Sequence, residues 1–282
     1  MQPNFLVTGA AKSGTTWLHL CLSEHPQVFL PDAKELHFFS YDSLYAKGVG
    51  WYESFFPRHL TQAAIGEIST SYLPSVSAAE RIKAYKPEMR LICILRNPIE
   101  RAYSHYCMDL RAGRATKDME VGLGSQSPYV QWGLYHGQLT RYRDQFPPQQ
   151  LKVLLFDDIQ HRPADLLREI YDFLEIDPTF TASLLQTPKN AKRSLPKYPR
   201  LYRSALSVYE TLTRLPMVQG PLESLRLNGA FDFIHRLNQG EQFPALPRDR
   251  SRFLVDHYQS DLECLSHSLG KDLMGWLTPY AD

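Results

Sequence analysis

The segment that starts at Phe5 constrains the fold more than any other part of the chain. An apolar run beginning there is typical of a buried strand, Gly9 and Gly14 stand five residues apart in the loop that follows, and Thr15 opens a helix. In a strand, loop and helix of this kind, the N–H groups of the loop and the positive end of the helix dipole converge on an anion. The sequence therefore predicts an anion site at this loop.

The loop differs from the usual triphosphate-binding pattern at one position. In GxxxxGK[ST] a lysine follows the second glycine, whereas here Thr15 occupies that place and Lys12 lies inside the loop. From there the ammonium group can reach past a bound phosphate toward a group that is being transferred. An ordinary strand-to-helix turn with incidental glycines is the alternative.

The overall composition places limits on fold and partners. With 282 residues, of which 43% are hydrophobic and 22% charged, the chain can bury one large core. A net charge of +1 gives no global attraction to nucleic acid or to an anionic membrane, so an anion site must be local. No apolar run approaches the roughly 20 residues that span a bilayer.

The position of the first predicted strand and the spacing of the cysteines indicate the cellular compartment and the state of the thiols. The first strand is expected by Asn4, which leaves no room for a signal peptide, so we expect a cytoplasmic protein. The four cysteines form no CxxC pair, and Cys93 lies in an apolar run. Buried free thiols are therefore expected, and disulfides or a metal site are not.

Strands and helices alternate along the first two thirds of the chain. Strands are predicted at residues 4–8, 63–67, 90–95 and 151–156, and the clearest helices at 75–85, 99–112 and 164–174. Pro98 and Pro163 sit where first-turn prolines belong. The expected fold is α/β, a P-loop-type parallel sheet flanked by helices, with ligands beyond the carboxyl ends of the strands.

From about residue 199 the pattern becomes helical, with candidate helices at 202–215 and 248–269. We expect a single domain over 1–282, in which 1–198 form the α/β nucleotide-binding core and 199–282 a helical C-terminal extension. Residues 118–127, rich in Gly and Ser, are predicted to form a mobile loop.

A second candidate phosphate site follows the third predicted strand. Arg96 ends this strand and cannot lie within the sheet without losing its hydration, so we expect it at the rim. Together with Ser104 on the next helix, its guanidinium can hold a phosphate by charge-assisted hydrogen bonds. The alternative is a rim arginine paired with a carboxylate. For Arg101 a solvated helix face and a ligand role are both open.

These segments resemble the sulfotransferases that use 3′-phosphoadenosine-5′-phosphosulfate (PAPS), above all the branch of heparan-sulfate sulfotransferases and bacterial relatives. The family's KxGTT segment, which binds the 5′-phosphosulfate, is matched by Lys12 to Thr16, and Arg96 and Ser104 match its 3′-phosphate ligands. The resemblance implies a binding site for PAPS and its product, adenosine-3′,5′-bisphosphate (PAP), made of Lys12, Ser13, Gly14, Thr15, Thr16, Trp17, Arg96 and Ser104.

The segment Lys34-Glu35-Leu-His37-Phe-Phe resembles the family's KExHFF, whose glutamate is the proposed catalytic base. Glu35 matches that glutamate, and His37 is the alternative base or an orienting partner. Two residues apart on an extended segment, the two side chains are expected to point the same way. A surface Lys-Glu pair before an aromatic core anchor is the alternative.

Two further segments depart from the family pattern. Lys192 and Arg193 lie in the order of a loop that brings basic residues over the nucleotide, but their spacing differs, and a solvated basic turn is the alternative. Glu67 is followed by Ile68 and Thr70, where the family usually has lysine and, two residues later, proline. Glu67 is therefore expected to be structural.

We expect a PAPS-dependent O-sulfotransferase with Lys12, Glu35 and His37 as catalytic residues and with no metal. The acceptor hydroxyl can belong to a sugar, a lipid, a phenol or a carrier-bound acyl chain; no nucleic acid partner and no membrane span are expected. The alternatives are a P-loop small-molecule kinase, for which Asp157 and Asp158 after the last strand could hold magnesium, and a non-catalytic nucleotide-binding module.

Overall fold

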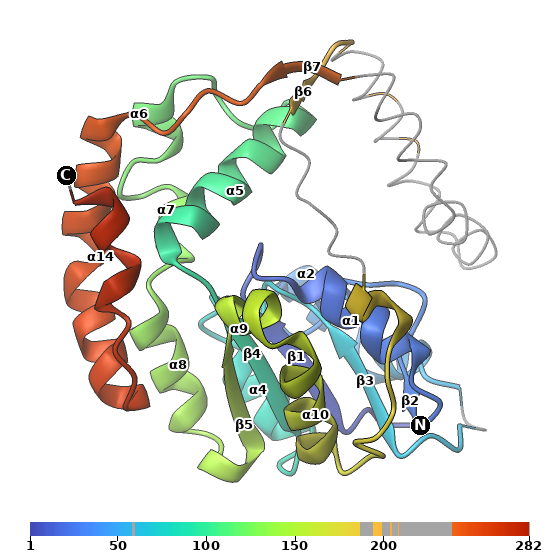
Figure 1. Cartoon of the computed structure of the whole chain (residues 1–282). Helices are drawn as coiled ribbons and strands as arrows, with labels where there is room; N and C mark the ends of the chain where they lie inside the picture. Colours follow the sequence, from blue (N-terminus) through green and yellow to red (C-terminus); the bar gives the residue numbers. More distant parts are fainter. Residues whose placement is uncertain (58–59, 187–193, 199–203, 205–207, 209–238, 282) are drawn as a thin grey trace.

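A parallel sheet of five strands forms the centre of the molecule. The sequence predicts a parallel sheet and four of these five strands. The computed structural model describes residues 1–57, 60–186, 194–198, 204, 208 and 239–281 (Figure 1). The strand order is β2-β3-β1-β4-β5, with parallel pairing throughout. The strands are β1 (Phe5–Gly9), β2 (Val28–Phe29), β3 (Ala64–Ile68), β4 (Arg90–Leu95) and β5 (Leu151–Leu155). The ends of β4 are as predicted. The strands β1, β3 and β5 each differ from the prediction by one residue at one or both ends. The two-residue strand β2 was too short to be predicted.

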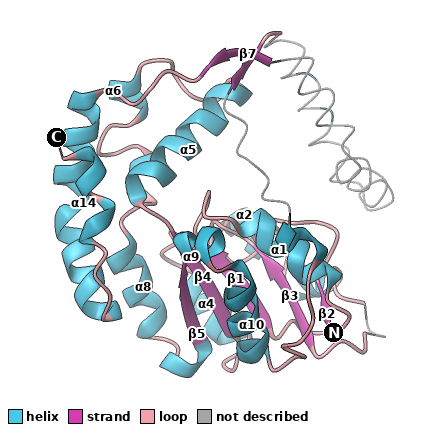
Figure 2. Cartoon of the chain, viewed as in Figure 1, coloured by secondary structure: helices cyan, strands magenta, loops and turns pink. Residues whose placement is uncertain are grey.

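Helices cover both faces of the sheet, because alternate residues of each central strand point to opposite sides. On one face Phe5 and Val7 of β1 pack against α1 (Thr15–Glu24) and α10 (Pro163–Leu174). On the other face Leu6 packs in a cluster with residues of α4 (Ala78–Tyr85), α8 (Tyr135–Arg143) and α14 (Arg248–Leu269). Figure 2 shows the resulting layers.

Helix α5 (Pro98–Ala112) leaves the rim of the sheet and runs away from it (Figure 1). Pro98 and Pro163 occupy first-turn positions of α5 and α10, as predicted. Helix α14 has the predicted bounds and contacts both α8 and α5. The strands β6 (Ser194–Pro196) and β7 (Gln239–Gln242) form a separate antiparallel pair. The helix predicted at 202–215 lies outside the described residues except for two single positions.

The remaining helical segments are short. They are α2 (Asp42–Tyr45), α3 (Val49–Glu53), α6 (Met119–Gly122), α7 (Pro128–Gln131), α9 (Phe156–His161), η1 (Pro148–Gln150), η2 (Ser183–Gln186), η3 (Met274–Trp276) and η4 (Thr278–Tyr280). The predicted loop at 118–127 contains α6, because the Asp118 carboxylate accepts hydrogen bonds from the N–H groups of Glu120 and Val121 and so starts a helical turn. Among the described helices, none has the length and apolar character to cross a bilayer.

Candidate functional site

The loop between β1 and α1 presents unpaired hydrogen-bond donors. Helix α1 begins at Thr15, and the first N–H groups of a helix have no carbonyl partner within it. Gly14 before it has a φ of 85°, and a Cβ there would lie 2.5 Å from Cδ1 of Ile159. The buried Ser13 hydroxyl has no hydrogen-bond partner within the described part of the chain. The loop therefore fits a ligand that brings acceptor oxygens, such as a phosphate.

The predicted loop residues come together at this point. Lys12 lies in the loop with a φ of 69°, and Thr16 and Trp17 follow Thr15 in the first turn of α1. Thr16 is exposed and Trp17 half-buried. Their roles as ligands stay predictions, but the chain places them around one short stretch of unpaired N–H groups.

Lys12 of the loop and three positive side chains close enough to affect its pKa form a group that we call the cationic cluster: Lys12, Lys34, Arg96 and Arg111. Burial, followed by the positive charges of the other three members, lowers the pKa of Lys12 to about 8, although Asp109 acts in the opposite direction. Like charges at short range raise the free energy of the site unless an anion lies between them. The cluster therefore favours an anionic ligand.

Arg96 lies at the carboxyl end of β4, at the predicted rim position. Its Nε and Nη2 donate to Oε2 of Glu100 at 3.1 and 2.8 Å, and Nη1 donates to the Lys12 carbonyl at 3.0 Å. The guanidinium also stacks on the Phe156 ring, 4.6 Å from its centroid. A guanidinium has five N–H donors, so two remain after these three bonds. The carboxylate pairing is thus present, and it leaves donors for a further anion.

The other candidate residues on α5 differ in environment. Ser104 is half-buried, about two turns from Arg96. Arg101 is 0% exposed and donates to the Tyr129 carbonyl, so the idea of a solvated helix face was wrong for this residue. This part of α5 is in contact with α7, which the sequence did not reveal. Lys192 and Arg193 lie outside the described residues.

Lys34 connects the phosphate loop to the acceptor-side segment. Its Nζ lies 3.4 and 3.3 Å from the hydroxyl oxygens of Thr15 and Thr16, and 3.3 Å from Oε1 of Glu35. Sequence reasoning gave no ligand role to this lysine. The sequence signal that could have suggested a role for Lys34 was its position next to Glu35 in the KExHFF-like segment. Its contact with α1, however, depends on how the chain folds back and cannot be seen in the sequence.

Glu35 and His37 lie side by side, although the segment between them is not extended. Both have positive φ, 65° and 56°, so the predicted alternation of an extended segment was wrong. Oε2 of Glu35 is nevertheless 3.9 Å from Nδ1 of His37, and the two side chains are 28% and 29% exposed. Two proton acceptors therefore face one another near the cationic cluster, with access to solvent.

Three consecutive residues after β3 hold this pair, and we call Ser69, Thr70 and Ser71 the hydroxyl loop. The Ser69 hydroxyl accepts from the His37 N–H at 2.9 Å, and Ser71 Oγ lies 2.6 Å from His37 Nδ1. The Thr70 N–H donates to Oε2 of Glu35 at 2.7 Å, and its hydroxyl donates to the same carboxylate at 3.1 Å. The hydroxyl loop therefore orients both candidate bases.

Beneath the hydroxyl loop lies a buried carboxylate. Glu67 is 1% exposed and accepts hydrogen bonds from Tyr72 at 2.5 Å, Ser69 at 2.7 Å and Tyr52 at 3.4 Å. Burial raises the pKa of Glu67 to about 7, against the opposing effect of these hydrogen bonds. The neighbouring Ile68 is a core residue and brings no charge to the site. These contacts agree with the expected structural role of Glu67.

The two acidic residues after β5 have partners of their own. Asp157 accepts a hydrogen bond from the Trp276 indole at 2.7 Å, and Asp158 pairs with Arg162 at 2.8 Å. Within the described ranges no three His, Cys, Asp or Glu side chains are grouped as metal ligands would be. The cysteines are free thiols, three buried and one exposed. Nothing here favours the magnesium site of a kinase.

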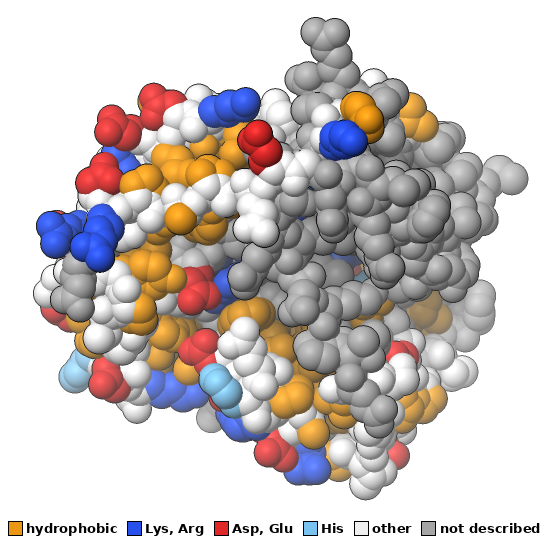
Figure 3. All heavy atoms as spheres, turned by 45° about the horizontal axis from the view of Figure 1, so that its top comes forward, with side chains coloured by type: hydrophobic (Ala, Val, Ile, Leu, Met, Phe, Trp, Pro, Cys, Tyr) orange, Lys and Arg blue, Asp and Glu red, His pale blue; other side chains and the backbone are white. Residues whose placement is uncertain are grey.

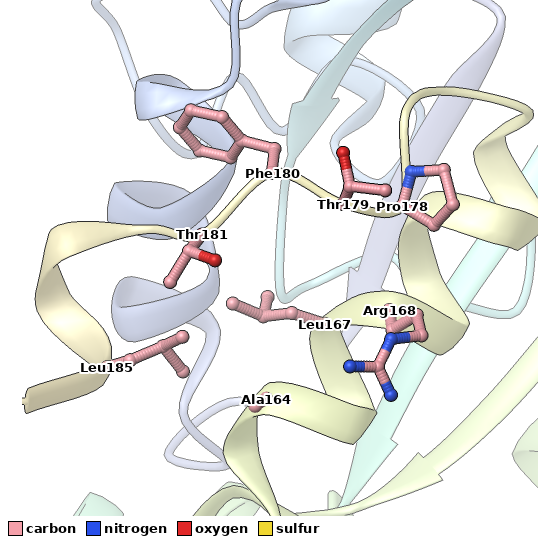
Figure 4. Close-up of a pocket in the computed structure, with 8 residues that line it drawn as sticks. All are labelled: Ala164, Leu167, Arg168, Pro178, Thr179, Phe180, Thr181 and Leu185. Carbon is pink, nitrogen blue, oxygen red and sulfur yellow. The ribbon is translucent and has the colours of Figure 1, made fainter.

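The surface and the cavities add two observations. Figure 3 shows side chains of both signs of charge on the described part of this face, with no large patch of a single sign among them. A cavity of about 440 Å³ lies between α10 and the segment that follows it (Figure 4), lined by Ala164, Leu167, Arg168, Pro178, Thr179, Phe180, Thr181 and Leu185. None of these residues belongs to the loops described above, so this cavity is separate from the candidate site.

Comparisons with known proteins indicate the family of the chain. The family model described as "Sulfotransferase domain" matches residues 2–196. A mouse protein (Mus musculus), bifunctional heparan sulfate N-deacetylase/N-sulfotransferase 3, is 28% identical over 300 residues that cover 98% of this chain and 31% of that protein. The membrane-associated sulfotransferase kil1 of Dictyostelium discoideum is 38% identical over 107 residues, covering 37% of this chain and 22% of kil1.

The chain spans 31% of the length of the mouse heparan sulfate N-deacetylase/N-sulfotransferase 3 and also 31% of the length of its human counterpart. Among solved structures, a sulfotransferase from Alicyclobacillus acidocaldarius superposes with a TM-score of 0.70 at 24% identity, covering 98% of this chain and 99% of the other. This likeness shows the fold.

Proposed function

The chain belongs to the family of PAPS-dependent sulfotransferases, and on this premise we propose that it transfers the sulfuryl group of PAPS to an acceptor hydroxyl. One observation carries the proposal: the cationic cluster converges on a glycine-containing loop whose buried Ser13 hydroxyl has no partner among the described residues. A ligand with several negative charges offsets the repulsion and supplies the acceptor that Ser13 lacks.

The residues present fit the two anionic ends of PAPS. The loop from Lys12 to Trp17 would hold the 5′-phosphosulfate, with the N–H groups at the start of α1 as donors. Arg96, which keeps two N–H donors beyond its bonds to Glu100 and Lys12, would hold the 3′-phosphate together with Ser104. When bound, PAPS supplies the sulfuryl group and a phosphate leaving group.

Within this arrangement the chain's own residues have distinct tasks. The Lys12 ammonium stabilises the negative charge that develops on the oxygen from which the sulfuryl group departs. Glu35 and His37 form the pair that accepts the acceptor's proton as its oxygen attacks. Lys34, in contact with both Thr16 and Glu35, couples the two halves of the site. None of these steps requires a metal.

The acceptor type is part of the proposal. A hydroxyl on a sugar, a lipid, a phenol or a carrier-bound acyl chain is our preferred class, and the base pair beside the loop supports it because an alcohol must lose its proton to attack. Relatives named as N-sulfotransferases make an amine the natural competitor in the test. The kinase alternative has no support, since Asp157 and Asp158 are engaged elsewhere.

Formation of PAP from PAPS with hydroxyl and amine acceptors tests the proposal. We expect turnover with at least one hydroxyl acceptor, without added metal. Lys12→Ala should lose most of this turnover, and Lys271→Ala, which changes an exposed lysine after α14, is the matched control that should retain it. Binding of PAP without turnover on any acceptor would point to a non-catalytic module, and ATP-dependent phosphorylation would point to a kinase.

A further inference from the structure

We propose that Nε2 of His37 is the atom that takes the acceptor's proton, and that Ser71 and Ser40 are positioning residues that fix the tautomer in which this nitrogen carries no hydrogen. The inference rests on the proposed function and deepens it. It starts from a chain of three contacts that begins at the His37 carbonyl and ends at the His37 ring.

The direction of each hydrogen bond follows from counting protons. The Ser40 hydroxyl is 3.1 Å from the His37 carbonyl oxygen, which can only accept, so Ser40 donates. The Ser40 hydroxyl has only one proton, so in its second contact it must accept a hydrogen bond. The donor is the Ser71 hydroxyl, whose oxygen lies 2.7 Å from that of Ser40. Ser71 in turn must accept from His37, whose Nδ1 lies 2.6 Å away. The ring proton is therefore on Nδ1, and Nε2 has the free lone pair.

The opposite direction fails on one contact. If Ser40 donated to Ser71 and Ser71 to His37 Nδ1, the Ser40 hydroxyl oxygen and the His37 carbonyl oxygen would stand 3.1 Å apart with no proton between them. Two oxygen lone pairs at that distance repel. The His37 carbonyl also accepts from the N–H groups of Ser40 and Tyr41 at 3.1 and 3.2 Å, so it has donors in either case. The first direction is favoured because it alone places a proton in all three side-chain contacts. Within the described residues Nε2 has no hydrogen-bond partner, so this nitrogen is available to an acceptor.

The surroundings of His37 keep the ring neutral at neutral pH. Burial lowers its pKa, and Lys34 lowers it further, while the Glu35 carboxylate acts in the opposite direction. The Tyr41 ring packs against the imidazole in a tilted arrangement, with centroids 5.0 Å apart. Burial, followed by the charge of Glu35, raises the pKa of this tyrosine, so it stays a neutral phenol. A neutral imidazole is the form that can act as a base.

Glu35 is less suited to take the proton because its oxygens already accept hydrogen bonds. Oε2 accepts from the Thr70 N–H at 2.7 Å, and Oε1 has Lys34 Nζ at 3.3 Å and the Thr70 hydroxyl at 3.2 Å. Its place 3.9 Å from His37 Nδ1 allows it to stabilise the imidazolium that proton transfer creates. Glu35 thus acts through His37.

The step balances as follows. The acceptor oxygen forms a bond to sulfur while the bond from sulfur to the phosphate oxygen breaks, and the electron pair of that bond leaves with PAP. The acceptor's proton passes to Nε2 of His37. The imidazolium, paired with Glu35, then returns the proton to water, so the net products are the sulfate ester, PAP and one proton.

The tautomer is tested directly by nitrogen-15 NMR of the histidine side chains, with the His37 signals assigned by their loss in His37→Gln. We expect hydrogen on Nδ1 and a bare Nε2 in the wild-type protein at neutral pH, and a shift toward the other tautomer in Ser71→Ala. Ser77→Ala is the matched control, because it removes a similar contact between two serines, Ser75 and Ser77, outside the site. Hydrogen on Nε2 in the wild type would overturn the inference.

Kinetics supply the second arm. We expect His37→Gln to lower kcat by about 10²–10³-fold with little change in KM for PAPS, and Ser71→Ala to lower it by about tenfold, as loss of one hydrogen bond would. Ser71→Thr keeps a hydroxyl and should restore most of the rate. An unchanged kcat in His37→Gln overturns the inference, and an unchanged kcat in Ser71→Ala overturns the positioning role of Ser71. Lack of any wild-type turnover would instead refute the proposed function, and the NMR arm would still decide the tautomer.

Discussion

The cationic cluster and the hydroxyl loop flank the same site but are stabilised in different ways. In the cationic cluster like charges face one another, and their repulsion helps to lower the pKa of Lys12 to about 8. In the hydroxyl loop each polar group has a neighbour: Ser69 bonds Glu67 and the His37 backbone, and Thr70 bonds Glu35. Arg96 and Lys34 of the cluster pair with Glu100 and Glu35, but the like charges remain close together, and we propose that a bound anion completes this region. The hydroxyl loop is already ordered without a ligand.

Because of this difference, we expect changes in the two regions to affect different measured quantities, nucleotide affinity in one case and turnover in the other. Changes in the cationic cluster should alter nucleotide affinity and its dependence on pH, because the cluster is relieved by an anion. Changes in the hydroxyl loop and the pair that it orients should alter turnover and leave nucleotide affinity almost unchanged. Lys12 is the exception, since it belongs to the cluster and also faces the reacting group in our proposal.

Replacement of Lys12 should give the largest effect. We expect Lys12→Ala to lower kcat by about 10²–10³-fold, the usual loss when a preorganised charge that stabilises the transition state is removed. Circular dichroism should match wild type, because the side chain lies in a loop and not in the core. Thermal unfolding should occur at no lower a temperature than in wild type, because the change removes a charge that burial and three like charges disfavour. Turnover close to that of Lys271→Ala would disprove the role given to Lys12.

Replacement of Glu35 should be milder and confined to turnover. We expect Glu35→Gln to lower kcat by roughly tenfold, because it removes the charge that stabilises the His37 imidazolium while keeping the shape of the side chain. Calorimetric affinity for PAP should stay within about twofold of wild type. A loss of kcat larger than that of His37→Gln would show that Glu35 is itself the base.

The affinity for PAP should fall as pH rises above about 8. Lys12 in the free protein has a pKa of about 8, and a bound anion favours its ammonium form, so the complex holds more protons than the free protein above that pH. Affinity should then drop by up to about tenfold per pH unit. Calorimetry from pH 7 to 9 measures this; a slope that persists in Lys12→Ala would assign the titration to another group.

Glu67 should affect stability more than catalysis. Its pKa in the folded state is about 7, above the ordinary 4.5, so the folded protein binds the extra proton and loses stability as pH rises from about 4.5 through 7. The gap corresponds to roughly 3 kcal/mol at about 1.4 kcal/mol per pH unit. Denaturant unfolding at several pH values should show this slope in wild type and a smaller one in Glu67→Gln. Equal slopes would contradict the assignment.

Local sequence patterns were enough to predict the central strands of the sheet and the position of Arg96 at its rim. The ends of β4, the first-turn proline of α5 and the position of Arg96 all follow from apolar runs and residue chemistry within a few positions. The pairing of Arg96 with Glu100 is an i, i+4 contact that the sequence left as an open alternative.

The hydroxyl loop could not be predicted in the same way. Thr70 and Glu35 are 35 positions apart, and the segment that carries Glu35 has positive φ at Glu35 and His37. Glutamate gives no sequence signal for positive φ, and histidine gives only a weak one. The sequence marked Thr70 as a departure from the family pattern, but only the fold reveals that its N–H and hydroxyl bind a carboxylate. Lys34 reaches α1 for the same reason, through chain reversal and not through local pattern.

The most direct test of the central claim compares PAP with AMP, which lacks the 3′-phosphate. With charge-assisted hydrogen bonds contributing roughly 1.5–3 kcal/mol each, we predict that PAP binds on the order of 10²–10⁴ times more tightly than AMP, with or without magnesium. Arg96→Ala should remove most of this preference, while Arg168→Ala, an arginine paired with Asp165 on α10, should keep it. Equal affinities for PAP and AMP in the wild-type protein would contradict the account.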